Sequence, residues 1–192
     1  MILSKFDLID TSNQIENLVE RCRRHDVQAQ NALYHALFGY VYTICFRYVA
    51  NEEETKEAVQ DVFFKAFTKL KYYQGAPSFH AWIKKIAVNT CIDRFRTRSK
   101  VAANIELTDV ADSGFAPEAL VDADADYLLY LISKLPFSYR TAFNMFAVDG
   151  FKYEEIAEQL GVAVGTVSAN ISKARRILQQ QISTNHDQKA YL

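Results

Sequence analysis

The stretch Phe151–Leu178, FKYEEIAEQLGVAVGTVSANISKARRIL, decides how the last third of this 192-residue chain folds. A first short helix is predicted from apolar residues at positions i, i+3, i+4 and i+7, namely Tyr153, Ile156, Ala157 and Leu160. Gly161 follows and supplies the left-handed residue that ends a helix. A second apolar stripe then comprises Val164, Val167, Ile171, Ala174 and Leu178. The pattern predicts a helix-turn-helix.

The opposite side of the second helix is predicted to be small and polar, then basic. At 3.6 residues per turn it carries Gly165, Thr166, Ala169, Ser172, Lys173 and Arg176, with Ser168, Asn170 and Arg175 on its flanks. This composition suits a helix that enters a DNA major groove by its N-terminal end. Thr166 and Asn170 could contact base edges, and the basic residues could contact phosphates. The alternative is a helical hairpin in an ordinary core.

Bulk charge does not indicate a nucleic-acid partner, because the formal net charge is −1. The distribution of charge does. Residues 84–100 contain six basic residues and one acid, whereas residues 101–127 contain seven acids and no base. This asymmetry indicates local contact with a polyanion.

Helical patterns and scarce Gly and Pro predict an all-α fold of two small helical domains, a helical bundle and a helix-turn-helix domain, joined by a flexible acidic linker. The predicted domains are residues 1–100, a linker of 101–121, residues 122–182 and a tail of 183–192. Asn51 is predicted to cap a helix from Glu52. The helices are expected at 14–24, 27–49, 52–70, 79–98, 122–135 and 138–148.

A second motif lies at Lys71–Arg98, where a loop with Gly75 and Pro77 precedes a basic helix. The aromatic residues there are Tyr72, Tyr73, Phe79 and Trp82. The phosphate partners would be Lys84, Lys85, Arg94, Arg96 and Arg98. Aromatic rings interleaved with cations are typical of a site that stacks unpaired bases. We interpret Trp82 and Ile86 as core, and Tyr73 and Asn89 as nucleic-acid contacts.

Catalytic, metal and membrane functions find little support in the sequence. Cys22, Cys45 and Cys91 are far apart and are interpreted as reduced, buried thiols of a cytoplasmic protein. The three other histidines are isolated, and Cys22 with His25 lacks a second ligand pair. We expect no enzyme activity, no cofactor, no metal and no small-molecule substrate, and no apolar run is long enough for a membrane span.

The two motifs, in this order with an acidic linker between them, resemble the extracytoplasmic-function (ECF, group IV) sigma factors of bacterial RNA polymerase. The resemblance runs from about Ile15 to Leu178. It rests on the segments Glu57–Lys65, Phe79–Ile83, Ile86–Thr90, Ile92–Asp93, Leu135–Pro136, Tyr139–Arg140, Tyr153–Ala157 and Gly165–Val167.

The resemblance implies a role for each part of the chain. The N-terminal domain would bind the polymerase clamp helices and melt the promoter at its −10 element, and the core flap would be a further contact. The residues toward the clamp would be Glu57, Gln60, Asp61, Phe64 and Lys65. Tyr73 would stack the first unpaired base, Gly75–Ser78 would cradle a flipped base, and Asn89 would read that strand.

The C-terminal domain would read the −35 duplex. Its contacts would be Thr166, Ser168, Ala169, Asn170, Ser172, Lys173 and Arg176. Ala163 stands where the family often has a capping serine or threonine, and Ser168 or Asn170 stands where it often has a cation, so weak isolated −35 binding is expected. An anti-sigma factor is an expected partner beside the polymerase core and promoter DNA.

Two other classes of protein stay open at this point. A stand-alone helix-turn-helix regulator would bind closed duplex without polymerase, and the aromatic loop would then have no use. A protein-interaction module, such as a sigma mimic, would have no need of Tyr73, Asn89 and the basic helix.

Overall fold

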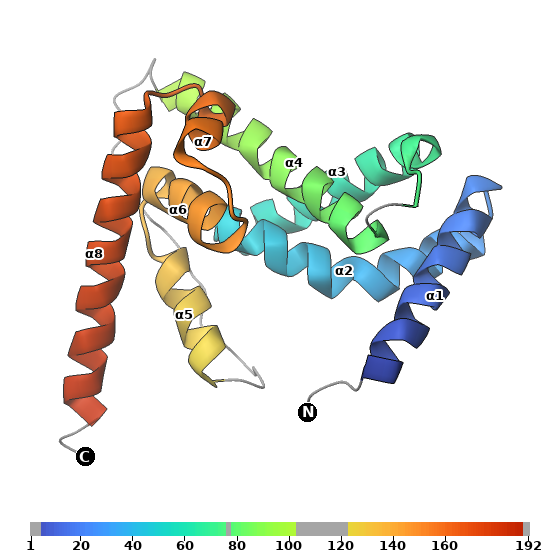
Figure 1. The fold of residues 1–192 in the computed structure, drawn as a ribbon, viewed down its shortest axis with the longest axis horizontal. Helices are drawn as coiled ribbons and strands as arrows, with labels where there is room; N and C mark the ends of the chain where they lie inside the picture. Colours follow the sequence, from blue (N-terminus) through green and yellow to red (C-terminus); the bar gives the residue numbers. More distant parts are fainter. Residues whose placement is uncertain (1–4, 76–77, 103–122, 190–192) are drawn as a thin grey trace. The chain divides into compact units, whose positions relative to one another are not determined.

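The computed structural model describes the backbone of residues 5–75, 78–102 and 123–189. Every regular element in this part of the chain is helical, which confirms the predicted all-α class (Figure 1). The chain divides into two compact units, one of residues 1–45 and 56–90 and one of residues 46–55 and 91–192. The predicted acidic linker lies outside the described residues, except for Val101 and Ala102, which end a helix.

Most helices of the first half begin and end close to the predicted positions, and the start of α1 is the main exception. The helices are α1 (Lys5–Arg23), α2 (Val27–Val49), α3 (Glu52–Lys69), the short 3-10 helix η1 (Leu70–Tyr72) and α4 (Phe79–Ala102). The predicted bounds of α2 are confirmed at both ends. α1 begins well before Gln14, and α4 continues past Arg98.

Side-chain caps explain where these helices begin. Asn51 Oδ1 accepts a hydrogen bond from the Glu54 amide at 3.0 Å, which confirms the predicted cap of α3. Asp26 Oδ1 accepts one from the Ala29 amide at 3.1 Å at the start of α2. This amide bond and the Arg21 guanidinium lower the pKa of the Asp26 carboxyl.

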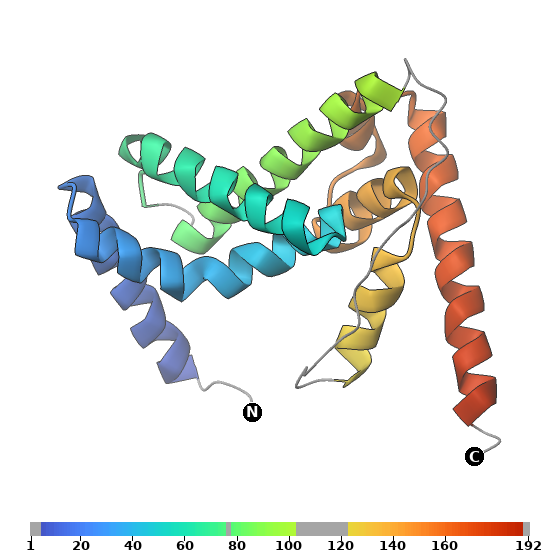
Figure 2. The same ribbon diagram turned by 180° about the vertical axis from the view of Figure 1, so that it is seen from behind.

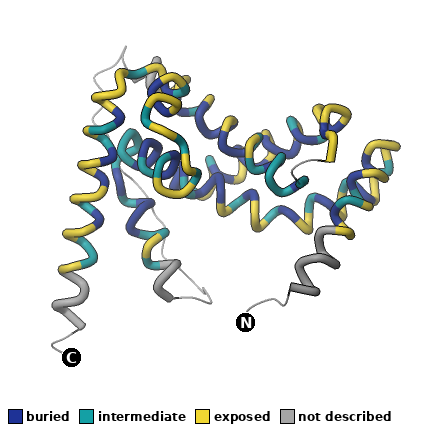
Figure 3. Tube along the Cα trace, viewed as in Figure 1, coloured by how far each residue is buried: buried dark blue, intermediate teal, exposed yellow. Residues whose placement is uncertain are grey.

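The core of the first unit is made of apolar faces of its helices, seen as the buried segments in Figure 3. Its fully buried side chains include Val19, Leu33, Leu37, Val41, Val59 and Ile83. An aromatic pair joins α2 to α3, because the Tyr34 and Phe63 ring centroids lie 4.6 Å apart. Cys22, Cys45 and Cys91 are buried free thiols, as the sequence indicated.

The second unit is organised around its last helix. It contains α5 (Ala123–Ser133), α6 (Phe137–Phe143), a π-helical turn η2 (Asn144–Val148), α7 (Tyr153–Leu160) and α8 (Val164–Lys189). Helices α5, α6 and α7 all pack against α8 (Figure 2). α8 continues to Lys189, whereas the sequence predicted that the helical domain ends at residue 182 and is followed by a tail.

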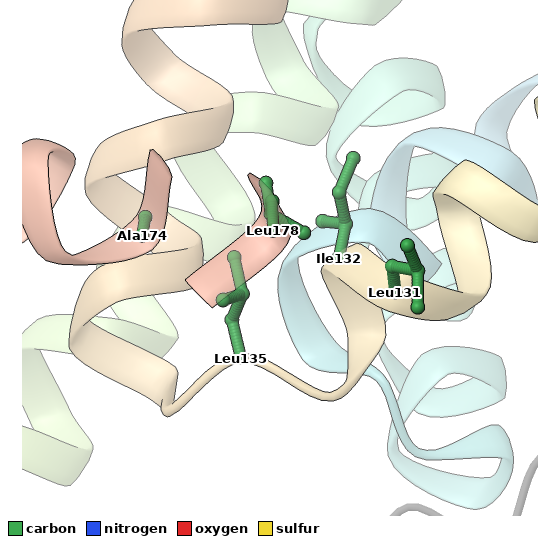
Figure 4. Close-up of a cluster of buried hydrophobic side chains, with 5 residues drawn as sticks. All are labelled: Leu131, Ile132, Leu135, Ala174 and Leu178. Carbon is green, nitrogen blue, oxygen red and sulfur yellow. The ribbon is translucent and has the colours of Figure 1, made fainter. Parts of the chain in front are cut away.

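A small apolar cluster fixes α5 against α8 (Figure 4). Leu131 and Ile132 of α5, with Leu135 of the turn that follows it, meet Ala174 and Leu178 of α8. Each side chain is nearly inaccessible to water, so the cluster contributes the hydrophobic free energy that orients α8.

The turn between α7 and α8 has the geometry that its sequence predicts. Gly161 adopts φ 69°, in the left-handed region that ends a helix. At the start of α7 the Lys152 amide donates to Glu155 Oε2 at 2.7 Å. α8 begins after Ala163, whose methyl side chain offers no oxygen to the first amides of the helix, as the sequence indicated.

The buried guanidinium of Arg140 joins several main-chain segments of the second unit. Its side chain is in α6, and the residue is only 5% exposed. Nε donates to the Tyr48 carbonyl at 3.0 Å, and Nη2 donates to the Val49 carbonyl at 2.9 Å. Nη1 donates to the carbonyls of Ser133 and Leu135 at 3.0 and 2.9 Å. One cation therefore satisfies the carbonyls at the end of α2 and those at the turn after α5.

Further polar contacts surround the same helix end. The Asn144 amide nitrogen donates to the Arg47 carbonyl at 2.6 Å. The Tyr48 hydroxyl donates to Asp149 Oδ2 at 2.5 Å, and Arg47 pairs with Asp149 at 3.7 Å. Burial of the phenol, and then the Asp149 carboxylate, raise the pKa of Tyr48 far above its ordinary value.

The described residues contain neither a candidate membrane span nor a candidate metal site. No helix there is long and apolar enough to span a membrane. Among the same residues, no group of three or more His, Cys, Asp or Glu side chains is placed to hold a metal ion.

We expect Arg140→Ala to lower the free energy of unfolding by about 3 kcal/mol or more, because it leaves buried carbonyls without donors. Arg140→Lys keeps the charge but not the planar fork, so it should be intermediate. Urea denaturation followed by circular dichroism measures both, with Arg176→Ala as an exposed control. If Arg140→Ala unfolded at the same urea concentration as wild type, Arg140 would not stabilise the fold through these carbonyls.

The contribution of Tyr48 to stability should disappear in alkali. In the unfolded chain its phenol ionises near pH 10, whereas the folded chain keeps it protonated, so the unfolded state gains an advantage as the pH rises. The difference in unfolding free energy between wild type and Tyr48→Phe should shrink by about 1.4 kcal/mol for each pH unit above 10. A difference independent of pH would show that Tyr48 titrates normally.

Candidate functional site

The recognition face of α8 consists of exposed residues on the side of the helix away from its apolar stripe. All six predicted members are exposed, namely Gly165, Thr166, Ala169, Ser172, Lys173 and Arg176. Ser168 and Asn170, predicted on the flanks, are half-buried. The structure therefore brings the predicted −35 residues together on one helix.

The stripe that holds this face outward differs from prediction at one position. Val167, Ile171, Ala174 and Leu178 are buried as expected. Val164 was expected in the same stripe, but this prediction is wrong, since the residue is 42% exposed. The reason is its place as the first residue of α8, at the tip of the helix.

Aromatic rings of the preceding elements hold two of the cations on α8. Lys173 Nζ lies 5.5 Å from the centroid of the Tyr139 ring in α6. The Arg175 guanidinium lies 5.1 Å from the Phe146 ring in η2. These cation–π contacts limit where the positive charges can lie and leave them at the surface. Arg176 is also exposed.

Tyr73, in the loop before α4, is placed differently from the sequence prediction of an available ring. The residue is 2% exposed, and its ring centroid lies 5.3 Å from that of Phe79 and 5.4 Å from that of Trp82. Its hydroxyl donates to Glu16 Oε1 of α1 at 2.6 Å, and its carbonyl accepts from Arg23. Burial, and then Glu16, raise the pKa of the phenol. In this arrangement Tyr73 holds the loop to α1.

The described parts of the predicted base-cradling loop have clear local roles. Gly75 is exposed and has φ 82°, a backbone conformation that other residues rarely adopt. Ser78 Oγ accepts from the Ala81 amide at 3.2 Å and so caps α4. Ala76 and Pro77 lie outside the described residues.

In the part of α4 that belongs to the first unit, polar residues line the side of the helix that faces solvent. Lys85 and Asn89, one helical turn apart, are exposed, and Lys84 is half-buried. Trp82 and Ile86, interpreted as core from the sequence, are only half-buried. This stretch of α4 therefore offers a cation and an amide to solvent within one turn.

The basic residues farther along α4 belong to the second unit and are engaged there. Arg96 Nε donates to the Gln159 carbonyl of α7 at 2.5 Å, and Arg94 is half-buried. Arg98 lies 3.5 Å from Glu54 and 5.0 Å from the Phe137 ring. Arg96 and Arg98 thus make protein contacts in this state.

Four of the five predicted polymerase-binding residues share one exposed side of α3. Glu57, Gln60, Asp61 and Phe64, at i, i+3, i+4 and i+7, are all exposed. Phe64 is 73% exposed, although it is a large aromatic residue on an otherwise polar face. Lys65 turns the other way and is half-buried, with its Nζ donating to Thr90 Oγ1 of α4 at 3.2 Å. Four of the five predicted residues therefore form one surface.

One exposed ring in this region was not among the predicted site residues. Tyr72, at the end of η1, is 67% exposed, and Lys71 Nζ lies 5.0 Å from its ring centroid. The sequence contains both tyrosines side by side, and nothing in the pattern says which one packs inward.

Comparison with known proteins adds family evidence to this geometry. Residues 33–101 match the family model "Sigma-70 region 2", and residues 125–178 match "Sigma-70, region 4". The first spans α3 and most of α4, and the second spans the helix-turn-helix.

Relatives match over most of their length. The chain is 28% identical to the RNA polymerase sigma-H factor of Pseudomonas aeruginosa, covering 90% of this chain and 95% of that protein. It is 27% identical to the ECF RNA polymerase sigma factor SigW of Bacillus subtilis, covering 88% and 96%.

A solved structure shares the fold. The sigma factor RpoE of Bartonella quintana, in complex with the anti-sigma factor NepR, aligns with a TM-score of 0.54 at 20% identity, covering 82% of this chain and 98% of that one. Two sigma-70 regions in the expected order, relatives matched almost end to end and the shared helical fold agree with one another. This chain belongs to the extracytoplasmic-function sigma factors.

Proposed function

We propose that this sigma factor divides promoter recognition between its two predicted domains, residues 1–100 and 122–182. As an ECF sigma factor, the chain directs RNA polymerase core enzyme to promoters and is not itself a catalyst. The presence of both sigma-70 regions in one chain favours this function over a stand-alone regulator. The finer assignment of residues to each contact is our proposal.

In this proposal the recognition face of α8 reads the −35 duplex. The observation that supports it is the sharp division of α8 into a buried apolar stripe and an exposed face of small, polar and basic residues. Small residues at the N-terminal end let the backbone approach a groove, and cations farther along meet phosphates. Thr166 and Ala169 would lie nearest the bases, Ser168, Asn170 and Ser172 would contact their edges, and Lys173 and Arg176 would contact the backbone.

The loop and α4 would capture the −10 strand. Exposed Lys85 and Asn89 support this role, together with exposed Gly75, whose left-handed backbone carries no side chain. Lys84, Arg94 and Arg96 would add phosphate contacts once the polymerase is bound, and Ser78 would hold the first turn of α4. Tyr73 would position the loop through Glu16.

The exposed side of α3 would bind the clamp helices of the polymerase. An isolated phenylalanine surrounded by Glu57, Gln60 and Asp61 is typical of an interface anchor with a polar rim. Lys65 would lie at the edge of this surface, held in place by its hydrogen bond to Thr90. The core flap would be a second contact.

Two further parts of the proposal concern the setting of the protein. The RpoE relative was solved with an anti-sigma factor, so we propose an anti-sigma partner for this chain as well. Because its work requires RNA polymerase and promoter DNA, we place the protein in the cytoplasm.

Gel filtration with bacterial core RNA polymerase tests the α3 surface. We expect the full chain to co-elute with the core and the double variant Gln60→Ala, Asp61→Ala to lose most of this co-elution, because both side chains lie on the proposed interface. The matched control is Glu158→Ala, Gln179→Ala, which removes the same two chemical groups from exposed positions elsewhere. A folded wild-type chain that does not co-elute would sink the proposed function.

Salt dependence of duplex binding tests the recognition face. In the holoenzyme, Arg176→Ala should lower the slope of log K against log salt concentration by about 0.9, the value for one phosphate contact. Arg21→Ala removes one exposed positive charge from α1 and should leave the slope unchanged. Equal slopes for wild type and Arg176→Ala would exclude a phosphate contact at this residue.

A further inference from the structure

We infer that α8 selects its −35 element by the methyl groups of thymine and the edge of adenine, and not by guanine. The inference deepens the proposed −35 function and rests on it. It names Thr166, Ala169 and Asn170 as the residues that set base preference. It follows from where α8 carries charge and where it does not.

The end of α8 that enters the groove carries no charged side chain. From Val164 to Ser172 every residue is apolar, small or polar, and Lys173 is the first charged residue of the helix. Direct reading of guanine requires an arginine or a lysine that donates to O6 and N7 of the base. The residues proposed nearest the bases therefore lack the side chain for that contact.

The cations of α8 lie too far along the helix to make this contact instead. At the rise of an α-helix, Lys173 lies about 10 Å beyond Thr166 along the axis, and the arginines that follow lie farther. Lys173 Nζ lies 5.5 Å from the Tyr139 ring centroid. The Arg175 guanidinium lies 5.1 Å from the Phe146 ring centroid. These contacts hold both charges beside the preceding elements, where they fit phosphates at the edge of the groove.

The groups that are present at this end of α8 match an A·T pair. Thr166 and Ala169 are exposed, and each carries a methyl group, which is a partner that the C5 methyl of thymine takes in the major groove. Asn170, next to Ala169 and half-buried, carries the amide that pairs with N6 and N7 of adenine. The hydroxyls of Ser168 and Ser172 fit either base pair and do not discriminate. The groups that do discriminate all favour A·T.

Selection of bound duplexes from a randomised pool by the reconstituted holoenzyme tests the base preference. Wild type should enrich A·T pairs in the segment that α8 reads. Asn170→Arg places a cation where the family often has one and should enrich guanine in the same segment. Gln179→Ala changes an exposed residue of α8 beyond its cations and should select the same sequences as wild type. A change in the preferred base cannot come from loss of stability alone.

Uracil in place of thymine tests the methyl contacts directly, because it removes the C5 methyl and leaves the base-pairing edge unchanged. In fluorescence anisotropy with a selected duplex, wild type should bind about 4-fold more weakly for each contacted methyl that is removed. Thr166→Ser keeps the hydroxyl and loses the methyl, and Ala169→Gly loses its methyl as well. Each variant should be less sensitive to uracil than wild type.

Each contrary outcome has a separate meaning. If wild type enriches G·C pairs in the segment, or binds the thymine and uracil duplexes equally, the inference is wrong. If Thr166→Ser and Ala169→Gly keep the uracil sensitivity of wild type, other residues read the element. If Asn170→Arg selects the wild-type sequence, residue 170 does not face the bases. A wild-type chain that forms no holoenzyme with the core, or that selects no sequence, would instead reject the proposed function.

Discussion

One buried cation sets the arrangement of the second unit. Arg140 donates to carbonyls at the end of α2 and at the turn after α5, all of which would otherwise be acceptors without donors in a water-poor site. α6, which carries Arg140, packs on α8, so the position of the recognition helix depends on this guanidinium. Burial of the hydrophobic cluster between α5 and α8 stabilises the unit. The directional hydrogen bonds of Arg140 fix the position of α6 relative to the end of α2 and the turn after α5.

The sequence was sufficient where a local rule decides the outcome. The bounds of α2, the Asn51 cap, the Gly161 turn and most of the α8 stripe follow from periodicity and capping. It was insufficient where tertiary packing chooses between equivalent residues. Tyr72 and Tyr73 are identical in type, and only the presence of Phe79 and Glu16 beside the second decides which is buried. Arg140 is a similar case, because its carbonyl partners have no side-chain signature.

The recognition face shows how elements that do not touch DNA contribute to reading it. Tyr139 and Phe146, from α6 and η2, hold the cations Lys173 and Arg175 near their rings. In the proposed complex, the direction in which these charges meet the backbone is therefore prepared before binding, which reduces the entropy lost on association. α6 and η2 thus help to define the surface that α8 presents.

The partners of Arg140 are main-chain oxygens, and this has a consequence for how the family can vary. A substitution at Val49 or Ser133 leaves the carbonyl in place, so the bond does not require any particular side chain there. Pairs of positions that are joined in this way need not change together during evolution. Comparisons of correlated substitutions between relatives would therefore not detect this contact, although the arginine itself would be retained. Contact maps inferred from such correlations would then underestimate how firmly the end of α2 is held.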